Sequence, residues 1–246
     1  LENSPETLTA LLQRLDSPST PVTFHDILSI TDPYLLDPSL PRPILALLLI
    51  SPSKVYNAVR AADSAEQTGY TGKDGTARTA SGDATGDTPI LFFKQTIPGS
   101  CGIIALLHAL CNSSALHHMT PASPLSDLIR AATLLPSEDR PQLLETSTEL
   151  AAANEAVAGL GESRMIERGR RVENHYVCFV KGGDGRLWEL DGRREGPVDR
   201  GPLGEGEGVV SGKGVESGVG RYLGAEGGER CCVVGMGVGR GEETEG

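Results

Sequence analysis

The strongest constraint on the fold is an unbroken run of aliphatic residues at 44–50, which lies between Pro43 and Pro52. A short apolar run without polar alternation is typical of a strand buried on both faces. Such a strand needs a neighbouring strand at each edge and a covering layer over each face. The run is about a third as long as a membrane-spanning helix, so we expect a layered domain built around a central sheet and no membrane segment.

Periodicity elsewhere in the chain supplies the other layers. Ser4 and Pro5 have the features of an N-cap and a first helical residue, and leucines then recur at helical spacing. The order of elements predicts a single α+β domain over residues 1–246, with a largely antiparallel sheet and helices packed against it. The expected helices are 5–15, 102–110, 125–135 and 142–158, and the expected strands are 22–27 at an edge, 44–50, 90–94, 176–180, 187–190 and 231–236.

Three segments have the composition of loops. Residues 62–88 are rich in Gly, Thr, Asp and Ser and are predicted to form a flexible surface loop. Residues 159–171 form a connection that contains Gly and Arg, and residues 204–246 form a glycine-rich tail. We expect the strands at 176–180 and 187–190 to pair as a hairpin through the glycine-rich turn between them.

The charge and cysteine content exclude several classes of protein. The formal net charge of -11 argues against nucleic acid, because phosphate binding needs a basic surface. The five cysteines are odd in number and form no CxxC pair, so neither a disulfide framework nor a zinc site is expected. No basic and then apolar leader opens the sequence, and the expected location is the cytoplasm, with the nucleus open as a second compartment.

One cysteine lies at a position in the chain that favours a nucleophilic thiolate. Cys101 begins the apolar helix at 102–110, directly after a break at Pro98 and Gly99. The first turn of a helix presents unpaired N–H groups and the positive end of the helix dipole, and both favour thiolate. These N–H groups and the side-chain amide of Gln95 are candidates to stabilise the oxygen of a tetrahedral intermediate. The pattern predicts Cys101 as nucleophile and Gln95 as an oxyanion-hole donor.

A base and its orienting acid are found further along the chain. Among the five histidines, only His175 adjoins a strand that leads through a hairpin to a buried acid, Asp191. Residues of paired strands can meet across a hairpin, so Asp191 is predicted to fix the tautomer of His175. A packing role for Cys101 stays open, because cysteine is among the most buried residue types.

Other residues of these types have simpler interpretations. The remaining cysteines are interpreted as packing residues: Cys111, Cys178, Cys231 and Cys232. His108 is interpreted as a residue at the edge of the core, and the pair at 117–118 as partners of a helix C-terminus.

Three motifs carry a resemblance to a known family. They are Gln-Thr-Ile-Pro-Gly-Ser-Cys-Gly at 95–102, His-Tyr-Val-Cys-Phe-Val at 175–180 and Leu-Trp-Glu-Leu-Asp-Gly-Arg at 187–193. In order and approximate spacing they resemble the motifs of the ubiquitin C-terminal hydrolase family of cysteine proteases, and the likeness extends to about residue 203. The resemblance implies a papain-like α+β fold with a knotted backbone and no cofactor or metal. It also implies Cys101 as nucleophile, Gln95 in the oxyanion hole, His175 as general base and acid, and Asp191 as its orienter.

The resemblance also implies a substrate class. The expected reaction is hydrolysis of ester, thioester, amide or peptide bonds at the C-terminal glycine of ubiquitin or a ubiquitin-like protein, by a monomer. By this resemblance, residues 159–171 are expected to form a loop that crosses the active-site cleft and admits only small or flexible leaving groups. Gly99 departs from the family, whose members often carry Asn there. The sequence shows no long C-terminal extension, so by this resemblance we expect the short, free-standing type of member. The alternative is a catalytically weak ubiquitin-binding module that keeps the fold.

Overall fold

The sheet is the centre of the molecule and it is antiparallel throughout. The computed structural model describes residues 4–30, 40–69, 90–158 and 174–239. Its six strands lie in the order β1-β6-β2-β3-β4-β5, and each neighbouring pair is antiparallel. The strands are β1 (Val22–Asp26), β2 (Ile44–Pro52), β3 (Asn174–Lys181), β4 (Arg186–Leu190), β5 (Val198–Pro202) and β6 (Cys232–Val238).

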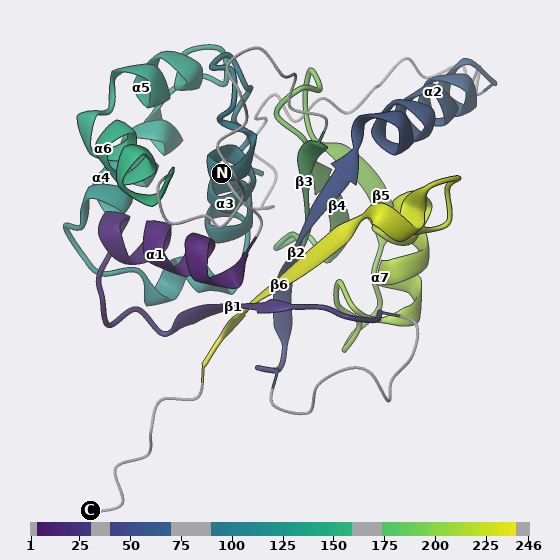
Figure 1. Ribbon diagram of the computed structural model, residues 1–246, viewed down its shortest axis with the longest axis horizontal. Helices are drawn as coiled ribbons and strands as arrows, with labels where there is room; N and C mark the ends of the chain where they lie inside the picture. Colours follow the sequence, from purple (N-terminus) through teal and green to yellow (C-terminus); the bar gives the residue numbers. More distant parts are fainter. Residues whose placement is uncertain (1–3, 31–39, 70–89, 159–173, 240–246) are drawn as a thin grey trace, which may run out of the picture.

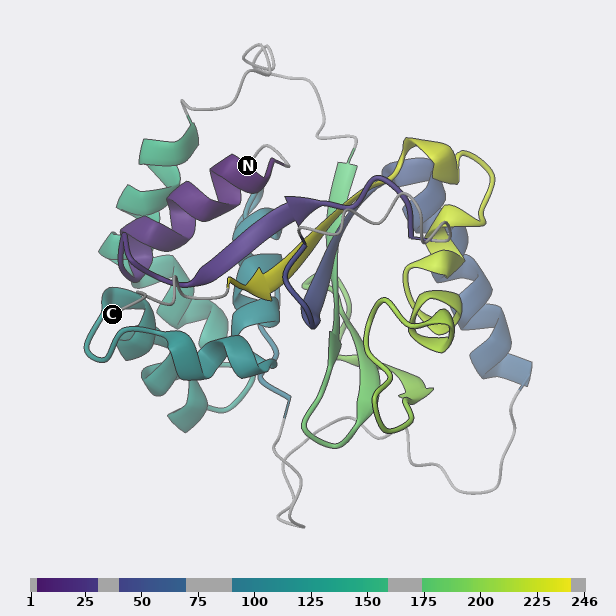
Figure 2. The ribbon, with the colours of Figure 1, turned by 90° about the horizontal axis from the view of Figure 1, so that it is seen from below.

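Helices cover both faces of this sheet, as Figures 1 and 2 show from two directions. One layer holds α1 (Pro5–Leu15), α3 (Cys101–Cys111), α4 (Pro124–Leu134), α5 (Arg140–Thr146), α6 (Thr148–Ala158) and the 3₁₀ helix η1 (Ser114–His118). The other layer holds α2 (Ser53–Gly69), α7 (Gly212–Ser217), α8 (Gly220–Leu223) and the 3₁₀ helix η2 (Gly228–Arg230). The α+β class predicted from the sequence is confirmed, and the knotted path stays a prediction.

Strand β2 is the central strand that its sequence predicts. It pairs with β6 at one edge and with β3 at the other. Successive side chains of a strand point to opposite faces, so Leu48 enters the core beneath α1 and α3, while Leu47 and Leu49 enter the core beneath α2. All three leucines are fully buried, and each contributes roughly 1.5–3 kcal/mol to folding.

Helix α1 begins as its sequence indicates. The Ser4 hydroxyl oxygen accepts a hydrogen bond from the Thr7 N–H at 3.1 Å, and Pro5 occupies the first helical position. The leucines at 8, 11, 12 and 15 are all buried against the sheet. Strand β1 lies at the edge of the sheet, as predicted for residues 22–27.

Helix α2 lies partly where a loop is expected. Residues 62–69 of the predicted loop continue α2, while residues 70–88 lie outside the described part of the chain. The helix buries Val55, Tyr56, Val59 and Asp63 against the sheet, and these four positions share one helical face. The last member of this face is a carboxylate that ion pairs keep buried, so the apolar pattern of the sequence ends before the helix does.

Residues 90–94 are extended but join no strand. The Leu91 N–H donates to Asn112 Oδ1 at 2.7 Å, and the Phe93 N–H donates to His108 Nε2 at 2.9 Å. Side chains of α3 and of the residue after it therefore satisfy the backbone groups that a sheet would otherwise pair. This arrangement anchors the segment that leads to Cys101 against the helix that Cys101 begins.

The glycine-rich end of the chain completes the domain. Within residues 204–239 lie α7, α8, η2 and β6, and β6 fills the gap between β1 and β2. Some of its glycines allow close backbone contact: a Cβ at Gly214 would overlap the carbonyl oxygen of Gly208. The predicted helix at 142–158 is two helices, α5 and α6, which are separated at Ser147.

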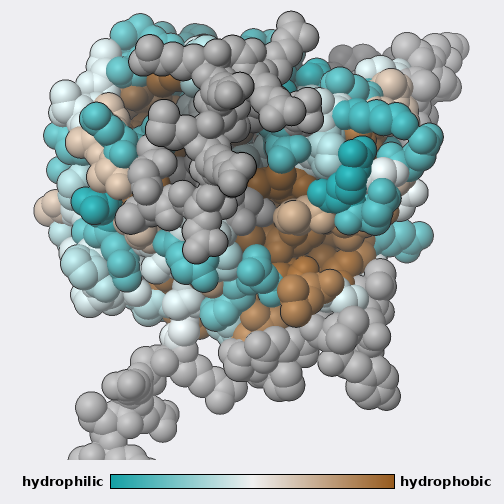
Figure 3. Space-filling model, in the orientation of Figure 1, coloured by the Kyte–Doolittle hydropathy of each residue, from teal (hydrophilic) through white to brown (hydrophobic). Residues whose placement is uncertain are grey.

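The surface mixes polar and apolar regions. On the face in Figure 3, hydrophilic residues predominate over the helices, and apolar residues gather below and to the right of the centre, over the strands. The most exposed large apolar side chains among the described residues are Leu28 and Leu134, at 85% and 81%. No helix in the described ranges is long and apolar enough to cross a membrane.

Candidate active site

The predicted nucleophile lies at the start of α3, and the start of this helix lacks a side-chain cap. Cys101 is the first helical residue, and Ser100 precedes it at the N-cap position. The Ser100 hydroxyl donates instead to the Ile97 carbonyl oxygen at 2.8 Å. By contrast, the hydroxyl oxygens of Ser4, Ser123 and Ser211 cap α1, α4 and α7. The first-turn N–H groups of α3 therefore have no such acceptor, as an oxyanion site requires.

The turn before Cys101 depends on glycine. Gly99 has a φ of +80°, a left-handed conformation that glycine adopts without strain. Asparagine is among the few other residues that tolerate this region. Backbone conformation thus explains why glycine can stand where the resembling family often has asparagine.

The predicted base and acid form a buried pair. His175 Nε2 and Asp191 Oδ1 lie 2.6 Å apart, and both residues are fully buried. Strand register brings them together: Cys178 pairs with Leu190, so continuing the ladder makes Asp191 a diagonal neighbour of His175 on the same face. The use of Nε2 in this pair leaves Nδ1 for the thiol of Cys101.

The three groups shift one another's protonation equilibria. Burial would raise the pKa of Cys101, but hydrogen bonding and charge interaction with His175 lower it below its ordinary value. Burial would lower the pKa of His175, but hydrogen bonds with Asp191 and Cys101 raise it. Burial would also raise the pKa of Asp191, yet the bonds from His175 and Tyr56 lower it. All three shifts favour the thiolate–imidazolium pair over the neutral pair.

The other cysteines provide a contrast. Burial raises the pKa of Cys111 to about 12 and also raises the pKa values of Cys178 and Cys231. Their predicted packing role agrees with this, but the same prediction is wrong for Cys232, whose side chain is exposed. Cys101 differs from these four cysteines in having an imidazole partner that lowers the pKa of its thiol.

Gln95 lies six residues before the nucleophile, and its side-chain amide is engaged locally. Its backbone N–H donates to the Gly192 carbonyl oxygen at 2.7 Å, which links the segment before Cys101 to the residue after Asp191. Its side-chain Nε2 donates to the Ile97 carbonyl oxygen at 3.2 Å. The amide nitrogen carries two hydrogens, so one remains for an oxyanion.

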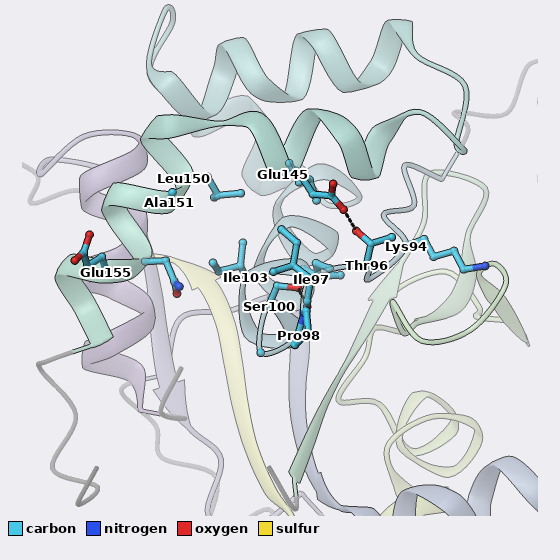
Figure 4. Close-up of a pocket in the computed structure, with 14 residues that line it drawn as sticks. Lys94, Thr96, Ile97, Pro98, Ser100, Ile103, Glu145, Leu150, Ala151 and Glu155 are labelled. Carbon is cyan, nitrogen blue, oxygen red and sulfur yellow. Dashed lines mark hydrogen bonds between the residues drawn. The ribbon is translucent and has the colours of Figure 1, made fainter. Parts of the chain in front are cut away.

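A pocket of about 370 Å³ adjoins the loop before Cys101 (Figure 4). Its apolar lining includes Ile103 of α3 and Leu150 of α6, and Glu145 and Glu155 add carboxylates. The Thr96 hydroxyl donates to Glu145 Oε1 at 2.6 Å, so the loop is tied to α5.

Sequence reasoning missed one residue of this site and misplaced another. The Tyr56 hydroxyl of α2 donates to Asp191 Oδ2 at 2.7 Å, although α2 itself was not predicted. His108, expected at the edge of the core, is fully buried, and burial lowers its pKa to about 4. His117 and His118 lie at the end of η1 and are exposed, and no metal-binding group of three or more His, Cys, Asp or Glu residues occurs in the described ranges.

An α+β fold with a helix-initiating thiol, an imidazole and a buried carboxylate defines the class of cysteine-type hydrolases. A family model described as "Ubiquitin carboxyl-terminal hydrolase, family 1" matches residues 1–219. The chain belongs to this family.

Individual relatives agree with this assignment. The ubiquitin carboxyl-terminal hydrolase isozyme L1 of Macaca fascicularis is 31% identical over 206 residues, which cover 84% of this chain and 83% of the relative. A ubiquitin carboxyl-terminal hydrolase of Drosophila melanogaster is 28% identical over 207 residues, which cover 83% and 82%. The UCH37 catalytic domain of Trichinella spiralis, solved bound to ubiquitin vinyl methyl ester, has the same fold: its TM-score is 0.66 at 17% identity, with coverage of 98% and 94%.

Proposed function

We propose that this protein hydrolyses bonds at the C-terminal glycine of ubiquitin, with Cys101 as nucleophile, His175 as base and acid, and Asp191 as the orienter of His175. The observation that carries the proposal is the buried 2.6 Å contact between His175 Nε2 and Asp191, which leaves the buried Nδ1 as the ring nitrogen available to the thiol. The family supplies the substrate class.

The proposed first step is an acyl transfer to sulfur. Cys101 Sγ attacks the carbonyl carbon of the terminal glycine, and the carbonyl oxygen becomes an oxyanion. The first-turn N–H groups of α3 and the free N–H of Gln95 stabilise that charge. The imidazolium of His175 then donates its Nδ1 proton to the leaving oxygen, sulfur or nitrogen, and a thioester to Cys101 remains.

The second step is hydrolysis of the thioester. His175 Nδ1 removes a proton from a water molecule, whose oxygen attacks the thioester carbon, and the thiolate of Cys101 leaves. Asp191 stays ionised through both steps and stabilises the imidazolium whenever it forms. No other group needs to exchange protons with the reactants.

A covalent probe tests this function directly. Incubation with ubiquitin vinyl methyl ester should add one ubiquitin to Cys101, and hydrolysis of a ubiquitin–fluorophore amide should accompany it. Cys101→Ala should lose both activities and still bind ubiquitin. Cys232→Ala is the matched control, because this exposed thiol lies outside the site.

The outcomes separate the enzyme from the alternative. Ubiquitin binding without an adduct by the parent protein would identify a catalytically weak binding module. Turnover that persists in Cys101→Ala would show that the nucleophile is wrongly assigned.

A further inference from the structure

One side chain of α2 contacts two members of the proposed triad. The Tyr56 hydroxyl donates to Asp191 Oδ2 at 2.7 Å, and the edge of its ring faces His175 with centroids 4.6 Å apart. Tyr56 is 2% exposed, so substrate cannot replace either contact without displacing α2. Both the rotation of the carboxylate and the tilt of the imidazole are therefore limited by one residue.

The donors around the carboxylate show what Tyr56 adds. Asp191 Oδ1 accepts from His175 and from the Arg193 N–H at 2.9 Å. At Oδ2, Tyr56 is the only hydrogen-bond donor within the described residues, since Arg194 Nε lies 3.8 Å away. A carboxylate held at one oxygen can turn about its Cβ–Cγ bond, but one held at both oxygens cannot.

The tyrosine hydroxyl is itself held in place by charge. Arg60 Nη1, one turn along α2, donates to this hydroxyl at 3.0 Å and leaves its hydrogen for Asp191. The guanidinium groups of Arg60 and Arg193 lie 5.5 and 5.9 Å from the centre of the Tyr56 ring. The other charged or titratable groups that face the pair are the Arg194 guanidinium of the β4–β5 connection, whose Nε lies 3.8 Å from Asp191 Oδ2, the Cys101 thiol of α3 and the more distant His108 imidazole, which burial keeps neutral near pH 7.

The second half of α2 is anchored by ion pairs to the buried carboxylate of Asp63. Asp63, two turns after Tyr56 on the same face, accepts hydrogen bonds from Arg194, Arg200 and Arg221. Two of these arginines also bind the fully buried Glu189 of β4. Helix α2 is thus fixed to the strand that leads to Asp191, so the position of Tyr56 is determined independently of the triad.

We propose that Tyr56 is a positioning residue of the reaction, which orients Asp191 through its hydroxyl and His175 through its ring. This role rests on the proposed function, because it acts on the triad that carries out the hydrolysis. The contacts of Tyr56 within the triad are those with Asp191 and His175. Its effect reaches Cys101 only through the alignment of His175.

The decisive variant removes one oxygen atom. Tyr56→Phe keeps the ring against His175 and leaves Asp191 Oδ2 without its donor. Loss of a residue that orients a metal-ligating histidine or carboxylate typically costs about 10–100-fold in activity, and we expect kcat to fall by a comparable factor here with KM unchanged. The carboxylate should also protonate at higher pH, and His175 then loses its anionic partner sooner as pH falls.

A chemically matched control exists on the same face of the sheet. The hydroxyl of Tyr222, also fully buried, donates to the carboxylate of Glu189 at 2.9 Å. Tyr222→Phe removes the same kind of bond from a carboxylate outside the triad. It should lower the melting temperature about as much as Tyr56→Phe does while kcat stays close to that of the parent.

Alkylation of Cys101 by iodoacetamide, followed over pH by mass spectrometry of its peptide, reports the thiolate without ubiquitin. We expect the acidic midpoint of the alkylation rate to rise by about half a pH unit in Tyr56→Phe and to stay unchanged in Tyr222→Phe. Because alkylation needs no ubiquitin, failure of the proposed function would leave this result intact. Equal midpoints in all three proteins would overturn the positioning role.

A double variant tests the route of the effect. In an Asp191→Asn background, adding Tyr56→Phe should lower kcat by less than about 2-fold, because the group that Tyr56 orients is already impaired. If Tyr56→Phe costs the same factor in both backgrounds, Tyr56 does not act through Asp191 and the proposal fails.

Discussion

Asp63→Asn should be among the most destabilising isosteric changes in this protein. The carboxylate of Asp63 is 4% exposed and binds three arginines that come from two separate parts of the chain. The asparagine side chain has nearly the same shape but no charge, and its NH₂ group would face guanidinium donors. Arg194 and Arg200, both largely buried, would then share Glu189 as their main counter-ion, and Arg221 would lose its ion pair with Asp63.

Two estimates give the size of the effect. Arginine contacts lower the pKa of Asp63 to about 2 from its ordinary 3.8 despite burial, which corresponds to roughly 2 kcal/mol of folding stability. Breaking a buried ion pair by removing one partner typically costs about 3–5 kcal/mol. We therefore expect a loss of about 2–5 kcal/mol, which lowers the melting temperature by about 4–20 °C in a chain of this length.

Thermal unfolding by circular dichroism tests the estimate. Glu226→Gln is the matched control, because Glu226 forms an exposed ion pair with Lys54, in which the side chains are 88% and 66% exposed respectively. Removal of this exposed pair should leave the melting temperature unchanged. A depressed pKa stabilises the fold above pH 3.8, so the difference between parent and Asp63→Asn should shrink as pH falls towards 2. A melting temperature within about 2 °C of the parent at pH 7 would refute the reasoning.

Three further predictions concern turnover. Gln95→Ala should lower kcat by about 100-fold or more with little change in binding, and an unchanged rate in ubiquitin–fluorophore hydrolysis would remove Gln95 from the mechanism. Glu155→Lys should raise KM by about 2–5-fold at low salt and less at high salt, because the carboxylates that line the pocket favour a cationic substrate segment and a lysine there would repel it. Glu226→Lys should have no effect on KM, and equal KM values for Glu155→Lys and the parent would remove the pocket from substrate binding. The parent should cleave a ubiquitin ester far faster than linked di-ubiquitin. Lengthening residues 159–171 with about ten Gly/Ser residues should reduce the difference between these two rates. Equal rates in the parent would exclude a crossover loop that limits the size of the leaving group.

Local sequence signals were enough to predict the centre of the site. The proline-bounded run at 44–50 predicted the central strand, and the Pro98-Gly99 break before an apolar run placed Cys101 at a helix start. Strand period and a short hairpin then placed His175 near Asp191, because pairing register follows from the turn. Each of these inferences needed only neighbouring residues or one short connection.

Helix α2 was not predicted, because the residues that stabilise it are distant in sequence. Asp63 is buried by arginines more than a hundred residues further along the chain, and a charged residue in a Gly- and Ser-rich region carries no periodic apolar signal. The contact of Tyr56 with Asp191 likewise spans 135 residues. Pairings of this kind follow from sheet topology, which local patterns do not encode.

The place of β6 in the sheet has a consequence for how the protein is made. Among the described strands β6 is the last to be synthesised, yet it lies between β1 and β2, so Val22 has no strand partner until Val238 is available. Until β6 has left the ribosome, one edge of β2 is open and β1 is unattached, and such edges are prone to pair with other chains. A stop codon in the glycine-rich stretch would therefore yield an unfinished sheet that is prone to aggregate, although Cys101, His175 and Asp191 would all be present.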